Sequence, residues 1–344
     1  MLIKAKRKRS GKRAVQKMGR KMPGRAGVLA AAIALVCAAV SPAVAQDYPN
    51  RSVKIVVPFP AGGTADAVPR LVGDWLSRKW GQPVVIENKA GAAGNIGAEG
   101  VFNSDADGYT LLSAPPPPLV INQSLYPKLG YDATQFVPII VMARVPNALS
   151  VNPGKVPQNT LAEFIAYAKA NPGKITSATQ GNGTTSHLTS EMFQMMAGVK
   201  FQHVPYRGSA PALQDLVAGN VDVMFDNLAS SLPLVQGGQL KLIAVAAPKR
   251  MAALPTAPTI AETLPGFEAT AWFGVVAPPK TPPEIVRKIN ADINEALRQP
   301  EIVSKLGGMA AEVVGGTPEA TGIFMREEVE RWRQVIKAAN VTLN

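Results

Sequence analysis

Twice along this chain a strand pattern runs into a glycine-containing loop that ends in threonine and opens a helix. The first strand is SVKIVVP (52–58), and the loop Ala61-Gly62-Gly63-Thr64 follows it. The second strand is KITSAT (174–179), and the loop Gly181-Asn182-Gly183-Thr184 follows it. The near-continuous apolar run of the first strand is typical of a parallel sheet covered on both faces. The recurrence of this junction predicts two α/β lobes that face one cleft.

Strands and helices alternate between and beyond these junctions, which predicts an α/β fold. After the first loop, apolar residues from Val68 to Leu76 share one helical stripe. Thr160 and Glu163 have the spacing of a capping box, and Thr317-Pro318 that of a capped helix start. The other expected strands or extended segments are 83–88, 109–114, 136–152, 201–206, 221–226, 240–247 and 273–279, and the other expected helices are 95–102, 187–198, 210–219 and two C-terminal regions.

The N-terminal segment has the order of parts that defines a secretory signal peptide. Residues 1–25 contain eleven Lys and Arg and no acid, residues 26–40 are apolar, and Ala43-Val44-Ala45 is an A-x-A cleavage site. The apolar stretch is shorter than the roughly 20 residues that a membrane span needs. We therefore expect cleavage after Ala45 and export to the periplasm.

The composition of the remaining chain excludes several kinds of site. It carries 25 basic and 24 acidic residues, so eleven of the twelve net positive charges belong to the N-terminal segment and no nucleic-acid partner is expected. Cys37 lies within the predicted signal peptide, which leaves no cysteine for a disulfide. His187 and His203 are sixteen residues apart, a spacing with no recognised metal-ligand pattern. We expect no metal, no cofactor and a monomer.

The first loop has the features of an anion site that needs no cationic side chain. Gly62 and Gly63 permit positive φ, and the helix start beyond them offers free N–H groups. Asp66 would repel a carboxylate unless it caps the loop or meets a ligand amine. A plain strand–helix connection is an equal alternative. If the loop does bind an anion, Gly63→Val is expected to abolish binding, most severely if Gly63 has a positive φ.

The second loop offers glycines, an amide side chain and three hydroxyls at another helix start. Ser186 beside His187 raises the possibility of a hydrolase, but chain neighbours seldom form a nucleophile–base pair, and no acid is placed to orient the ring. Thr184, Thr185 and Ser186 can also simply cap the helix.

Polar residues at two further strand ends could line the same cleft. Tyr206 and Arg207 follow the strand 201–206, and Asp226 ends the strand 221–226. Local capping explains each of them equally well. The stretch GAAGNIGAEG (91–100) departs from a dinucleotide-binding fingerprint and predicts either a second anion cradle or a tight turn.

In its sequence motifs the chain resembles the tripartite tricarboxylate transporter substrate-binding family, also called Bug proteins. The stretches that carry the resemblance are YPNRSVKIVVPFPAGGTAD, GQPVVIENKAGAAGNIGAEGV, DGYTLL, GNGTTSHL, HVPYRGSAPAL, VDVMFDN, LPTAPTIAE and WFGVVAP. The resemblance implies a two-lobed periplasmic binding protein fold of type II, in which each lobe is a mixed sheet flanked by helices and the ligand cleft lies between them. Lobe 1 would comprise residues 46–125 and 247–344, and lobe 2 residues 126–246.

The resemblance also implies a function and a set of ligand contacts. The protein would deliver a small organic carboxylate to an inner-membrane permease of the tripartite tricarboxylate type, or present it to a sensor protein, and would not be an enzyme. Pro115 to Pro118 depart from the family pattern, as does Pro69, because prolines supply no N–H donor. The expected ligand-binding residues are Phe59, Ala61, Gly62, Gly63, Thr64 and Asp66 in the first loop, Gly181, Asn182, Gly183, Thr184, Thr185, Ser186 and His187 in the second, and Tyr206 and Asp226.

Overall fold

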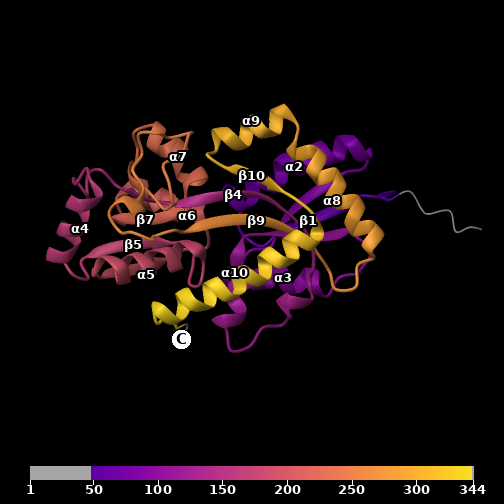
Figure 1. Ribbon diagram of the computed structural model, residues 1–344, viewed down its shortest axis with the longest axis horizontal. Coiled ribbons are helices and arrows are strands. Elements are labelled where there is room, and N and C mark those ends of the chain that lie inside the picture. Colours follow the sequence, from indigo (N-terminus) through magenta and orange to yellow (C-terminus); the bar gives the residue numbers. More distant parts are fainter. Residues whose placement is uncertain (1–47, 343–344) are drawn as a thin grey trace, which may run out of the picture. The chain divides into compact units, whose positions relative to one another are not determined.

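The predicted alternation of strands and helices is present in the computed structural model, which describes residues 48–342 (Figure 1). The strands are β1 (Val53–Val57), β2 (Val84–Asn88), β3 (Thr110–Ala114), β4 (Val137–Val151), β5 (Ile175–Thr179), β6 (Phe201–Pro205), β7 (Val223–Asn227), β8 (Lys241–Val245), β9 (Thr270–Ala277) and β10 (Glu312–Gly315). The α-helices are α2 (Thr64–Trp80), α3 (Asn95–Phe102), α4 (Leu161–Ala170), α5 (Thr185–Ala197), α6 (Ser209–Ala218), α7 (Leu228–Gln236), α8 (Pro283–Leu297), α9 (Pro300–Gly308) and α10 (Pro318–Ala338).

Two βαβαβ units with the same strand order form most of the sheet. In the first unit, β1 lies between β2 and β3 and pairs with both in parallel. In the second, β5 lies between β6 and β7 and again pairs with both in parallel. Each glycine loop therefore follows the central strand of its unit, at the carboxyl edge where α/β proteins bind ligands.

The long strand β4 joins the two units. The order of strands is β2-β1-β3-β9-β4-β7-β5-β6, with β8 and β10 also paired to β4. The first part of β4 pairs antiparallel with β9 and β10, and residues 147–151 pair antiparallel with β7 and β8. The sequence left open whether residues 136–152 form paired or continuous segments. They form one continuous strand of 15 residues.

Apolar packing fixes the helices that follow both glycine loops. In α2, Val68, Val72 and Leu76 of the predicted stripe are buried at 0–1% exposure. In α5, Phe193 lies with its ring centroid 5.0 Å from that of Phe225 on β7. Burying an apolar side chain contributes about 1.5–3 kcal/mol, so these contacts hold both helix starts at the sheet edge.

Local signals in the sequence had mixed success. The capping box at Thr160 and the cap at Thr317 are both present and confirm those helix starts. α7 and β10 were not predicted, because α7 contains Pro233 and two serines and β10 has only four residues. The C-terminal region forms three helices rather than two, with Pro300 opening the additional one.

The predicted export signal, residues 1–45, lies outside the described residues. Within residues 48–342, none of the helices combines the length and the apolar character needed to cross a membrane.

Candidate functional site

In the first loop the residue with positive φ is Gly62, not Gly63. Gly62 has φ +92°, whereas Gly63 has φ −93° and ψ 172°, an extended conformation open to any residue. A Cβ at Gly63 would lie 3.5 Å from Ser209, an ordinary contact. The condition for the most severe effect of Gly63→Val, a positive φ at Gly63, is therefore not met, and Gly62 is the conformationally sensitive position.

Asp66 holds the first loop by capping it. Its Oδ2 accepts a hydrogen bond from the Gly62 N–H (3.2 Å), Asn88 donates to Oδ1 (2.9 Å), and the Arg70 guanidinium forms an ion pair with it (2.8 Å). Burial alone would raise the pKa of Asp66, but the hydrogen bonds from Arg70, Asn88 and Gly62 outweigh burial and lower it. Of the two roles that the sequence allowed, Asp66 has the capping role.

The first loop contacts the second βαβαβ unit and the helix after it through two serines that the sequence reasoning missed. The Thr64 N–H donates to Ser230 Oγ on α7 (3.1 Å), and the two hydroxyl oxygens are 2.7 Å apart. Gly63 packs against Ser209, the first residue of α6. One signal could have identified Ser209: Gly208, with φ +117°, repeats the strand–glycine–helix junction after β6.

The second loop is buried and holds its own helix cap. Thr184 is fully buried, accepts from the His187 N–H (3.4 Å) and donates to the Gly181 carbonyl (2.7 Å). Thr185 and Ser186, the first two residues of α5, are 2% and 0% exposed. In the described part of the chain, neither of their backbone N–H groups has an acceptor. Asn182, in contrast, is exposed.

Ser186 and His187 do not form a nucleophile–base pair. The Ser186 hydroxyl donates to the Phe225 carbonyl of β7. The His187 ring accepts at Nδ1 from the Gly183 N–H (3.2 Å) and faces Glu191 with Nε2 (3.6 Å). Since the hydroxyl and the imidazole bond to different groups, the arrangement lacks the hydrogen bond that would activate the serine.

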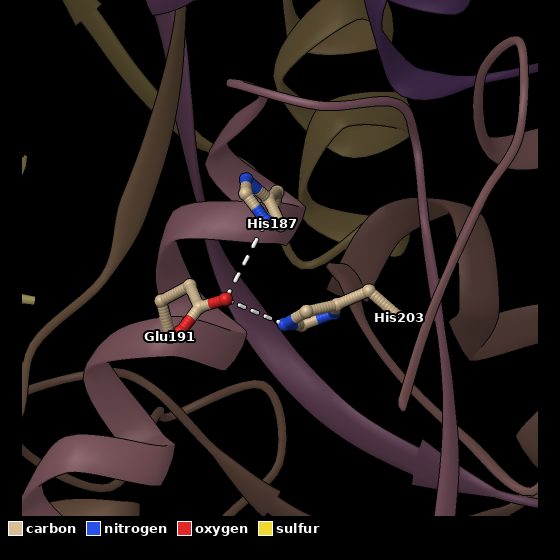
Figure 2. A group of neighbouring side chains, drawn as sticks. All are labelled: His187, Glu191 and His203. Atoms are coloured by element: carbon tan, nitrogen blue, oxygen red, sulfur yellow. Dashed lines mark ion pairs between the residues drawn. The ribbon is translucent and has the colours of Figure 1, made fainter. Parts of the chain in front are cut away.

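The two histidines, which the sequence treated as unrelated, lie together around Glu191 (Figure 2). Their ring centroids are 4.8 Å apart in an edge-to-face arrangement, and Glu191 Oε1 lies 2.8 Å from His203 Nε2. Burial would raise the pKa of Glu191, but hydrogen bonds from both histidines lower it to about 2. The i,i+4 spacing of His187 and Glu191 on α5 was the only local signal of this cluster.

The cluster contains three potential metal-ligand atoms within 4.8 Å of one another. A metal-binding histidine normally donates its second ring N–H to an acceptor. Here His187 Nδ1 already accepts from Gly183, and His203 Nδ1 is buried with no partner among the described residues. A metal on both Nε2 atoms would put two N–H groups where no acceptor lies. The arrangement is better suited to orienting His187, and through it the Gly183 backbone.

Asp226 lies where both units meet. It is fully buried at the end of β7, and its Oδ1 accepts from Ser209 Oγ (3.0 Å) and from Gln180 Nε2. Burial raises the pKa of Asp226 to about 6. Because Ser209 also packs against Gly63, the carboxyl of Asp226 is one side chain away from the first loop. Gln180, which follows β5 directly, gave no signal in the sequence.

Tyr206 and Phe59 direct their side chains away from the loops. The Tyr206 hydroxyl donates to Asp215 on α6 (2.6 Å), and burial raises its pKa to about 12. Phe59 is 8% exposed, and its ring lies beside Pro118 at the Gly94 turn. The backbone of Tyr206 remains near the second loop, because a Cβ at Gly181 would lie 3.2 Å from the Tyr206 carbonyl. Ala61, between Phe59 and Gly62, is exposed.

The GAAG stretch forms a tight turn that packs against the proline run. Residues 91–94 all have positive φ, and the Gly94 N–H donates to the Gly91 carbonyl (3.0 Å). Pro118 belongs to a buried π-helical turn, Pro117–Ile121, whose atoms would lie 3.1 Å from a Cβ at Gly94. The proline run thus supports the turn with apolar contacts.

Two hollows in the described structure lie away from the loops. The larger, of about 850 Å³, is lined by β4, β9, β10 and α10, and the smaller, of about 450 Å³, by α8 and α10. In the larger one, Arg144 is paired with Glu312 and Arg331 with Glu328. Lys249 also lines the larger hollow, and neither hollow is lined by residues of the two glycine loops.

Comparison with solved structures defines the class of protein. The fold matches Rpa4515 of R. palustris with adipate at a TM-score of 0.84, with 41% identity over 86% of this chain and 99% of that one. It also matches MatC of Rhodopseudomonas palustris with bound malate at a TM-score of 0.80, with 34% identity over 84% and 100% of the two chains. The fold is that of a periplasmic solute-binding protein.

The sequence comparisons identify the family. A model described as the tripartite tricarboxylate transporter family receptor matches residues 68–341. Protein BugT of Bordetella pertussis is 37% identical over 88% of this chain and 94% of BugT. The chain belongs to the tripartite tricarboxylate transporter receptor, or Bug, family, as its sequence motifs predicted. Members of this family bind substrates and are not enzymes.

Proposed function

We propose that this protein captures a small organic carboxylate in the periplasm and delivers it to a tripartite tricarboxylate permease. The observation that carries the proposal is the start of α5, where two adjacent buried N–H groups, of Thr185 and Ser186, have no acceptor in the described structure. Leaving a buried donor without a partner costs about 1–3 kcal/mol, so such groups normally meet a ligand or water. A helix N-terminus favours an anion.

The ligand would lie between two lobes, residues 46–125 with 247–344, and residues 126–246, after removal of the signal peptide at Ala45. Thr64 and Ser230 belong to different lobes, and their hydrogen bonds would form when the cleft closes. The first loop, from Phe59 to Asp66, would cover the carboxylate that the second, from Gly181 to His187, binds. Tyr206 would contribute its backbone and Asp226 its carboxyl.

The two Rhodopseudomonas palustris relatives support a dicarboxylate as the first ligand to test, because they hold adipate and malate. Transport and sensing use the same binding step. A permease gene next to the gene of this protein would favour transport. Native mass spectrometry of freshly purified protein is expected to show a co-purified carboxylate.

The decisive experiment removes one N–H group from the start of α5. Thr185→Pro deletes that donor at the first helical position, where proline is well tolerated. Thr184, with φ −75° and ψ 164°, already has the extended backbone required before proline. A hydrogen bond to a charged group contributes about 1.5–3 kcal/mol, so calorimetry with adipate and malate should show a loss of roughly 10- to 150-fold.

Thr185→Val is the matched control, because it keeps the N–H group and the branched side chain while removing the hydroxyl. We expect it to bind like the wild type. Equal, unchanged affinity in both variants, with the helix content intact by circular dichroism, would remove the start of α5 from the site.

A further inference from the structure

One oxygen of Asp226 has no partner. The residue is fully buried, and its Oδ1 is saturated by Ser209 and Gln180. Oδ2 is inaccessible to water and meets no hydrogen-bond geometry within the described residues, although the Asn227 N–H is near enough to the carboxyl to lower its pKa. A buried carboxyl oxygen without a partner is rare in folded proteins and calls for an explanation, such as a ligand.

The groups bonded to Asp226 supply no cation to balance a negative charge, and Arg207, two residues before Ser209, is exposed to solvent. The end of β5 contributes the neutral amide of Gln180, α6 contributes the hydroxyl of Ser209, and β4, which pairs with β7, contributes the neutral Asn147. The titratable groups on the neighbouring α5 and first loop are His187 with Glu191, and Asp66 with Arg70. Each of these is paired with the other member of its own group.

Asp226 also adjoins both parts of the proposed anion site. The carbonyl of the preceding residue, Phe225, accepts a hydrogen bond from the Ser186 hydroxyl, which places the end of β7 against the start of α5. Ser209, which donates to Asp226, contacts the first loop at Gly63. A carboxylate bound between these elements would therefore lie close to a second carboxyl group, with no cation between them.

We propose that Asp226 holds a proton in the liganded protein and donates it from Oδ2 to the bound carboxylate. The proposal rests on the proposed function and specifies its chemistry: the protein takes up one proton with each anionic ligand. Two adjacent carboxylates cannot both remain ionised, so one proton is shared between them. The hydrogen bond from a neutral carboxyl to a carboxylate is short and strong.

The direction of the pH dependence follows from this proton uptake. Burial already raises the pKa of Asp226 to about 6 before any ligand binds, and a nearby anion raises it further. Above about pH 6 the free protein has lost this proton and the complex has not. The affinity for a carboxylate should therefore fall as the pH rises, by up to tenfold per pH unit. A ligand that placed an ammonium group at Oδ2 would show the opposite dependence.

The test is calorimetric titration between pH 6.5 and 8.5, where simple carboxylate ligands stay ionised, with a panel of mono-, di- and tricarboxylates that includes adipate and malate. Repeating each titration in two buffers with different heats of ionisation counts the protons taken up. We expect close to one proton per ligand above pH 7. The affinity of Asp226→Asn should not change with pH, because its amide donates at every pH.

Asp215→Asn is the matched control, since Asp215 lies on α6, and its pKa is already lowered by hydrogen bonds from Tyr206 and Asn220. This variant should keep the pH dependence of the wild type. Binding without proton uptake in the wild type, or a pH dependence that persists in Asp226→Asn, would overturn the proposal and leave the proposed function intact. If no carboxylate binds to the wild type, both fail. Should Asp226→Asn not fold, the proton count of the wild type alone decides.

Discussion

The two glycine loops occupy equivalent places in two units of the same topology, yet they present their backbones differently. In the first, side chains engage alternate N–H groups: Asp66 binds that of Gly62, and Ser230 that of Thr64. In the second, the adjacent N–H groups of Thr185 and Ser186 have no acceptor in the described structure. The first loop is partly exposed, and the second is almost entirely buried.

This difference shows that the shared topology gives both loops the same position in the sheet, whereas side chains decide which backbone N–H groups stay free. Both helix starts lie at the carboxyl edge of a parallel sheet, where N–H groups can bind an anion. A free N–H group lowers stability only in the buried second loop, because water can bind the N–H groups of the partly exposed first loop. We infer that the second loop binds the ligand, while the first, held by Asp66 and Ser230, covers it.

The largest effect is expected from a side chain at Gly62. Gly62→Val forces a branched residue into positive φ, at a cost of about 1–3 kcal/mol, which should displace the first loop. Calorimetry with adipate or malate should show roughly a 5- to 150-fold weaker affinity. Gly63→Ala is the control: its backbone is extended and its Cβ makes an ordinary contact, so binding should change little. A stronger effect at Gly63 than at Gly62 would contradict our description of this loop.

A medium effect is expected from the cap of the second loop. Thr184→Ala removes the acceptor of the His187 N–H and the donor to the Gly181 carbonyl. Loss of a threonine cap costs about 0.5–2 kcal/mol, which urea unfolding should detect. Thr184→Ser keeps the hydroxyl and is expected to retain most of the stability. If the alanine and serine variants unfold at the same urea concentration, the cap does not hold this loop.

The smallest effect concerns the acid that caps the first loop. The pKa of Asp66 is lowered in the folded protein, so its stabilisation is present above the unfolded value of about 3.9 and is lost as the pH falls below it. Arg70 is nearly half exposed, so we expect about 1 kcal/mol or less. The melting temperature between pH 6 and 2.5 should fall less steeply in Asp66→Asn than in the wild type. Parallel curves would show that Asp66 does not contribute.

Asp226 titrates in the opposite sense to Asp66. Its pKa is raised to about 6, so its contribution to stability is fully present below the unfolded value of about 3.9 and is lost as the pH rises through about 6. The contributions of Asp66 and Asp226 to stability therefore change with pH in opposite directions.

The sequence predicted the parts of the fold that depend on local chemistry. The helix caps at Thr160 and Thr317 and the glycine-containing loop after each central strand required only neighbouring residues. The family motifs then pointed to both loops as ligand contacts. The ligand contacts stay a prediction, whereas the caps and the loops were predicted correctly because capping and glycine conformations are properties of short segments.

The remaining features depend on contacts between distant segments. Ser209, Ser230 and Gln180 enter the site because α6 and α7 begin and β5 ends at the same sheet edge, and only Ser209 has a local signal, the preceding Gly208. His187 on α5 and His203 on β6 meet because the helix packs over the neighbouring strands of the sheet. One local feature was missed as well. The sequence did not show that Gly62, rather than Gly63, has the positive φ, which goes with the hydrogen bond from the Gly62 N–H to the Asp66 carboxylate.

The shared strand β4 has a consequence for how the protein unfolds. Its first part belongs to the ladder with β9 and β10, and its last five residues belong to the ladder with β7 and β8. The second βαβαβ unit pairs with β4 directly through β7, and the first is joined to it through β9, which pairs with both β3 and β4. Heat should therefore melt both units in one cooperative transition, and the amide hydrogens in the middle of β4 should exchange with solvent only when the whole sheet opens.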